Sequence, residues 1–137
     1  MTRGPRAAAV FALWVAACGT SGRPPLDRVP VGTWGGDDSG LIVSADGAHA
    51  HVGCTNGDVA GEIPLDGEGR FDVAGIYNVD AFPVDRGIRH PARLTGRTDG
   101  RTLTFTVRLT DTGQTLTSGE LVLGREPRMQ NCPICRR

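Results

Sequence analysis

The chain has 137 residues, which is enough for one domain and leaves little room for a second. Hydrophobic residues make up 39% of it, so the chain can bury a core and is not a disordered tail. Its formal net charge of +0 gives no electrostatic footprint for nucleic acid, and the absence of lysine excludes Schiff-base chemistry and a P-loop.

The first 17 residues have the pattern of a secretory signal peptide. Arg3 and Arg6 precede an unbroken apolar run at residues 7–17, and small residues close it. This run is too short to span a bilayer as a helix, which takes about 20 residues. We therefore expect residues 1–17 to be removed, which leaves 13 arginines against 15 acidic residues and a net charge of −2.

The apolar run ends in Val15-Ala16-Ala17-Cys18, which resembles the lipobox of bacterial lipoproteins. The resemblance implies that Cys18 is lipidated, becomes the first mature residue and carries several acyl chains, enough for stable anchoring. Gly19 in place of aspartate after the cysteine implies the outer membrane, with the domain facing the periplasm. The alternative is an ordinary signal peptide cut after Ala17.

Residues 18–30 are rich in glycine and proline and are predicted to form a flexible tether. From residue 31 the hydrophobic pattern has period two, which indicates half-buried antiparallel strands. Turns are expected at Asp46-Gly47, Asn56-Gly57 and Asp99-Gly100, and residues 78–90 form the long loop. Eight short strands are predicted, at residues 31–35, 41–45, 48–54, 59–65, 70–77, 92–98, 101–110 and 115–123.

The predicted fold is all-β: a small antiparallel up-and-down barrel of about eight strands over residues 31–125, followed by a tail at 126–137. Gly32-Thr33-Trp34 resembles the Gly-x-Trp motif of lipocalins and avidins. That resemblance implies that Trp34 plugs one end of the barrel and that a basic residue after the last strand, Arg125 or Arg128, stacks on it.

A longer stretch, residues 31–132, resembles a group of short bacterial lipoproteins without an assigned activity. The shared motifs are Gly-Thr-Trp-Gly-Gly, Gly-Arg-Phe-Asp-Val, Pro-Ala-Arg-x-Thr-Gly-Arg and Leu-Thr-Asp-Thr-Gly, with one cysteine before an early turn and one near the end. This resemblance implies the same fold and the same address, and it implies no mechanism.

If lipid occupies Cys18, three cysteines remain and one disulfide at most can form within the chain. The candidates are Cys54–Cys132, Cys54–Cys135 and Cys132–Cys135, and the last closes too small a ring to restrain the unfolded chain. The related lipoproteins have one cysteine in each of the two regions. The resemblance therefore implies a Cys54–Cys132 bond that pins the tail and leaves Cys135 spare.

Other motifs have structural interpretations. His49 and His51 could ligate zinc or copper with help from His90, but strand alternation is expected to point the pair outward, so no metal site is predicted. Cys132-x-x-Cys135 lacks the strand–helix setting of a redox motif. Residues 36–40 faintly resemble a protease nucleophile loop and residues 66–72 a calcium loop, and both are expected to be turns.

These observations predict an exported, lipid-anchored envelope protein that binds a small ligand or an envelope partner, without a catalytic site or a cofactor. The alternative is a purely structural barrel with a filled interior, and an enzyme ranks third. The interior separates the first two: Leu103, Phe105, Val107 and Leu109 favour filling, whereas Ala48, Ala50, Ala92 and Gly96 favour space.

Overall fold

A computed structural model describes residue 4, residues 24–130 and residue 132. In that part of the chain the regular structure is all β, and no helix occurs that could cross a membrane. The strands are β1 (Gly32–Gly36), β2 (Ser39–Val43), β3 (Gly47–Val52), β4 (Thr55–Ala60), β5 (Arg70–Asn78), β6 (His90–Thr98), β7 (Thr102–Leu109), β8 (Thr115–Thr117) and β9 (Leu121–Leu123).

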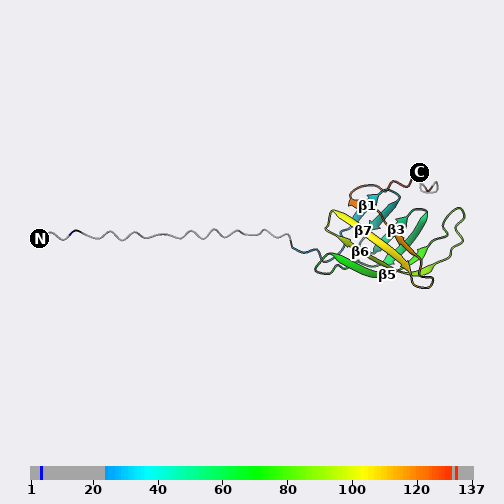
Figure 1. Ribbon diagram of the computed structural model, residues 1–137, viewed down its shortest axis with the longest axis horizontal. Coiled ribbons are helices and arrows are strands. Elements are labelled where there is room, and N and C mark those ends of the chain that lie inside the picture. Colours follow the sequence, from blue (N-terminus) through cyan, green and yellow to red (C-terminus); the bar gives the residue numbers. More distant parts are fainter. Residues whose placement is uncertain (1–3, 5–23, 131, 133–137) are drawn as a thin grey trace.

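The strands form one closed antiparallel barrel (Figure 1). The sheet order is β6-β5-β4-β3-β2-β1-β9-β7-β8, and a further pairing between β6 and β7 closes it. Strands β8 and β9 pair with successive parts of β7, so they act as two pieces of one strand, and the ring has eight members. The predicted fold class is thereby confirmed, and the barrel is compatible with a calycin-like fold.

The split between β8 and β9 has a local cause. Ser118 is buried at this point, and its Oγ accepts a hydrogen bond from the N–H of Phe105 (2.9 Å). The backbone N–H of Ser118 in turn donates to the Phe105 carbonyl (2.8 Å). A side chain thus replaces one backbone acceptor of the ladder, and the strand predicted as continuous over residues 115–123 is interrupted there.

One predicted turn is wrong. Asn56 and Gly57 lie inside β4, and the chain turns earlier, at Gly53, whose φ of +57° suits a residue without a side chain. Gly57 faces Tyr77 across the β4–β5 pair, where a Cβ atom would lie 2.1 Å from the tyrosine ring. The glycine therefore makes room for an aromatic ring, and β4 begins and ends earlier than predicted.

The barrel has two ends with different connections. The entry end carries residues 24–31, which lead into β1, and the connections at 44–46, 61–69 and 99–101. The loop end carries the turns at 37–38, 53–54 and 110–114 and the long loop at 79–89. Figure 1 shows the blue segment that precedes β1 and the yellow-green long loop at opposite ends of the barrel.

Candidate functional site

The barrel interior is a packed core. Its three largest fully buried side chains, Trp34, Tyr77 and Phe105, are at most 1% exposed and come from β1, β5 and β7. Inward side chains of the other strands join them in one continuous cluster. The small residues Ala48, Ala50 and Ala92 are buried in that same cluster, so the large side chains take the space that they leave.

The entry end is closed by the last part of the predicted tether. Val29 is 2% exposed, and its N–H donates to the Ile63 carbonyl (2.9 Å). The N–H of Leu65 donates to the Asp27 carbonyl (2.9 Å), and Arg28 forms an ion pair with Glu62. Residues 27–30 therefore pack on the barrel rather than serving as a flexible tether.

Trp34 lies next to this segment. Its Nε1–H donates to the Pro30 carbonyl (3.0 Å), which satisfies the buried indole. The Arg125 carbonyl covers Gly35 on the outer face of β1, and the arginine is exposed, so the stacking of Arg125 on Trp34 that the resemblance implies stays a prediction. Arg128 lies at the loop end, paired with Asp37 (2.7 Å).

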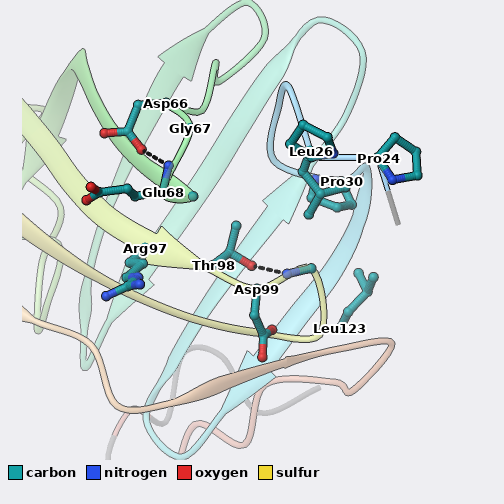
Figure 2. Close-up of a pocket in the computed structure, with 13 residues that line it drawn as sticks. Pro24, Leu26, Pro30, Asp66, Gly67, Glu68, Arg97, Thr98, Asp99 and Leu123 are labelled. Carbon is teal, nitrogen blue, oxygen red and sulfur yellow. Dashed lines mark hydrogen bonds between the residues drawn. The ribbon is translucent and has the colours of Figure 1, made fainter. Parts of the chain in front are cut away.

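A groove of about 490 Å³ opens at the entry end (Figure 2). Pro24, Leu26 and Pro30 form one wall, and the turns at 66–69 and 97–100 form the other. The carboxylates at its rim are already engaged: Asp66 accepts from the N–H groups of Glu68 and Arg70, and Asp99 from those of Arg101 and Thr102. These bonds lower the pKa values of Asp66 and Asp99. The carboxylates of Asp66 and Asp99 thus stabilise the two turns that form one wall of the groove.

The C-terminal tail crosses the outer face of β1 and β2. Gly35 and Gly40 face each other in these strands, and a Cβ atom on Gly35 would lie 2.2 Å from the Arg125 carbonyl oxygen. One on Gly40 would lie 2.5 Å from the Pro127 ring. Only glycine at both positions allows the tail to approach this closely.

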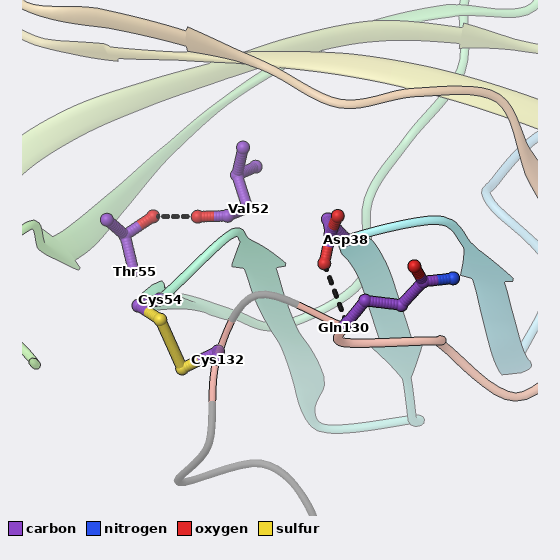
Figure 3. Close-up of a disulfide and its surroundings, with 6 residues drawn as sticks. All are labelled: Asp38, Val52, Cys54, Thr55, Gln130 and Cys132. Carbon is purple, nitrogen blue, oxygen red and sulfur yellow. Dashed lines mark hydrogen bonds between the residues drawn. A yellow bond between two sulfur atoms is a disulfide. The ribbon is translucent and has the colours of Figure 1, made fainter.

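A disulfide between Cys54 and Cys132 holds the end of this tail (Figure 3). This is the pairing that the resemblance implied. Backbone bonds secure the same region: Arg128 N–H donates to the Gly36 carbonyl, and Asp38 N–H to the Arg128 carbonyl, both at 2.9 Å. The Asp38 carboxylate accepts from the Gln130 N–H (2.8 Å), as Figure 3 shows. Cys18 and Cys135 lie outside the described residues.

The long loop at 79–89 is anchored at its base and apolar toward solvent. Asn78 is fully buried, and its Nδ2 donates to Asp85 (2.8 Å), which also accepts from the Gly87 N–H (2.7 Å). These two bonds lower the pKa of Asp85. The apolar side chains of Phe82, Val84 and Ile88 in this loop are all more than 40% exposed. The loop thus presents three apolar side chains from a fixed base.

Tyr77 is buried beside this base. Its hydroxyl contacts Thr55 Oγ1 (2.9 Å). Burial penalises the phenolate and raises the pKa of Tyr77 to about 12, although the bond to Thr55 acts in the opposite direction. At neutral pH the phenol is therefore neutral, and its hydroxyl is satisfied by Thr55.

His49 and His51 lie on β3, whereas His90 begins β6. Ala48 and Ala50 are buried, whereas His49 and His51 lie half-buried on the outer face of β3. His49 Nδ1 contacts Asp58 (2.6 Å), and burial together with the charge of His49 lowers the pKa of His51. His90 lies at the loop end and contacts Asp111 (2.8 Å), far from the pair along the sheet. The described residues contain no cluster of three metal-ligating side chains suited to an ion.

No protein-family model, no curated protein and no solved structure matches this chain.

Proposed function

We propose that this protein is an exported, lipid-anchored envelope protein whose barrel binds an envelope partner through its outer surface. The packed core favours binding on the outer surface over binding inside the barrel, because Trp34, Tyr77 and Phe105 occupy the space in which a lipocalin-like ligand would sit. The lipobox-like Val15-Ala16-Ala17-Cys18 supports the lipid anchor, and Gly19 supports the outer membrane.

The loop at 79–89 is the contact surface in this proposal. It lies at the opposite end of the barrel from residues 24–31, so an anchor at Cys18 attaches the protein by the other end. Phe82, Val84 and Ile88 are close in sequence and each is exposed, and exposed apolar side chains on an anchored loop are typical of protein contact sites.

A packed interior is also what a purely structural domain would have, and that remains the second candidate. The loop distinguishes the two candidates, because a domain without a partner gains nothing from exposing Phe82 and Val84. The proposal includes no catalytic role.

Photo-crosslinking in cells tests the contact surface. A photoreactive phenylalanine at residue 84 should yield one discrete envelope adduct, whereas one at residue 42 should yield none. Ile42 is the matched control, because it is 46% exposed but lies on the barrel wall in β2. Phe82→Ser should reduce the adduct from residue 84. Equal adducts from both positions, or no effect of Phe82→Ser, would favour the structural alternative.

Palmitate labelling tests the anchor separately. In a bacterial host the wild-type chain should incorporate radiolabelled palmitate and sediment with membranes, because Cys18 provides the only thiol at the signal cleavage site. Cys18→Ser should do neither. Equal labelling of the two chains would contradict lipidation at Cys18.

A further inference from the structure

The outer face of strands β5 to β8 differs in composition from the rest of the surface. Its outward positions carry six threonines, four arginines and a single acidic residue, Asp72, with few apolar side chains. The threonines are Thr95, Thr102, Thr104, Thr106, Thr115 and Thr117, and the arginines are Arg70, Arg93, Arg97 and Arg108. We call these eleven residues the Thr/Arg face.

The strand register places like charges opposite each other. Arg93 on β6 faces Arg108 on β7, and Arg70 on β5 faces Arg97 on β6. Directly opposed like charges destabilise an antiparallel pair. Arg93 forms an ion pair with Asp72 (2.8 Å), and Arg70 with carboxylates of its own turn. In the described part of the chain, Arg97 and Arg108 form no ion pair. Glu68, Asp99 and Glu120 line hollows with Arg97 but do not pair with it.

A row of hydroxyl groups lies between these two arginines. Thr95 faces Thr106 on the next strand, and Thr106 faces Thr117 on the one after it. The hydroxyls of Thr106 and Thr117 contact each other (3.3 Å). Each hydroxyl can donate one hydrogen bond and accept two, so the row keeps unused capacity toward solvent.

We propose that the Thr/Arg face binds an anionic polysaccharide, a polymer whose sugars bear carboxylate groups. Arg97 and Arg108 lie in rows four residues apart along the strands, about 13 Å, so a single small anion does not reach both. A polymer with repeated carboxylates does, and its sugar hydroxyls match the threonine row between them. The inference goes beyond the proposed function and depends neither on the lipid anchor nor on the loop at 79–89.

Two other polyanions fit the face less well. Single-stranded nucleic acid is bound by aromatic stacking, and no aromatic side chain points outward from β5 to β8. An anionic membrane favours apolar side chains that insert beside the basic ones, and the arginines here alternate with threonines.

Binding of the mature protein to immobilised polygalacturonate tests the proposal, with neutral dextran, polyglutamate and phosphatidylglycerol vesicles alongside. R97Q with R108Q should weaken polygalacturonate binding about tenfold or more, since the variant loses the charge-assisted hydrogen bonds of both guanidinium groups to carboxylates. R86Q with R125Q is the matched control, because it removes the same charge at exposed positions outside the face, in the loop at 79–89 and the C-terminal tail, and should leave affinity unchanged.

T106V separates sugar recognition from charge. This variant keeps every arginine and a β-branched side chain but removes the central hydroxyl, so it should weaken binding to polygalacturonate and not to polyglutamate. The proposal is overturned if polyglutamate binds as well as polygalacturonate, if both double variants lose affinity equally, or if only the vesicles bind. A melting curve of each variant confirms folding, and all of these side chains lie on the surface.

Discussion

The two halves of this barrel are stabilised in different ways. Strands β1 to β4 hold six glycines, are short, and have the C-terminal tail and a disulfide packed against them. Strands β5 to β7 are eight or nine residues long, hold two glycines, and pair with one another in unbroken register. The outer face of β1 and β2 is therefore covered by the C-terminal tail. The outer face of β5 to β7 carries no such segment of the described chain and stays open to solvent.

The difference shows how one sheet divides its tasks. A strand that lacks side chains gains little from its own packing, so the first half obtains its contacts from the tail and from the residues that enter before β1. The second half obtains them from alternating inward side chains such as Leu94, Phe105 and Val107. The proposed binding face, the Thr/Arg face, accordingly lies on the half whose outer face is not covered by other described segments.

Loss of the disulfide should have the largest effect. Cys54 and Cys132 are 78 residues apart, and a loop of this length contributes up to about 4–5 kcal/mol on the chain-entropy model. Cys132→Ser should lower the free energy of unfolding by a few kcal/mol in urea titration, and Cys54→Ser with Cys132→Ser should match it. A wild-type melting temperature in both variants would contradict a role for the disulfide in stability.

Gly35→Ala should rank second, at about 3 kcal/mol, because the new methyl group overlaps the tail backbone at Arg125. Gly67→Ala is the control: it introduces the same methyl group into open space at the entry end and should change stability by less than about 0.5 kcal/mol. If both substitutions cost the same, the tail does not pack on β1 as described.

Much of the second half was predictable from sequence and less of the first half was. The alternation of Leu103, Phe105 and Val107 with threonines predicts β7 almost to the residue, because packing in this strand follows its own pattern. Asn56-Gly57 predicts a turn that does not occur. Glycine is required at position 57 because the ring of Tyr77, twenty residues away, packs against it. Gly35 and Gly40 are likewise explained by a contact that is distant in sequence, because the C-terminal tail packs against them.

The candidate sites divide in the same way. The outward direction of His49 and His51 follows from alternation within one strand. The filled interior could not be predicted in this way. The sequence has both large and small inward residues, and only their packing in the structure shows whether the interior is filled. The Thr/Arg face also needs the register: threonines alternate visibly along β7, but that Arg93 faces Arg108 depends on how β6 and β7 pair.

Alkaline pH should destabilise the protein through Tyr77. Its pKa is raised to about 12 in the folded state and is near 10 when unfolded, so stability is complete below pH 10 and falls as pH rises toward 12. The loss should reach about 2–3 kcal/mol. The chain has one tyrosine, so tyrosinate absorbance reports on this residue alone. Ionisation near pH 10 in the folded protein would contradict its burial.

Asp72→Asn should have the smallest effect on stability, within about 0.5 kcal/mol, because Asp72 and Arg93 form an exposed pair. The same substitution releases Arg93 and should tighten polygalacturonate binding. Asp58→Asn is the control on the opposite half, where it should leave polygalacturonate binding unchanged. Unchanged binding of Asp72→Asn would mean that Arg93 takes no part in the Thr/Arg face.

Amide chemical shifts of the isotope-labelled mature protein, titrated with a galacturonate oligomer, distinguish outer from interior binding most directly. The amides of Thr95, Thr106 and Thr117 should shift with increasing ligand, because these residues lie side by side on the outer face. The indole N–H of Trp34 should not move, since it is buried in the core and bonded to Pro30. A moving indole signal with a silent threonine row would place the ligand inside the barrel and contradict a packed interior.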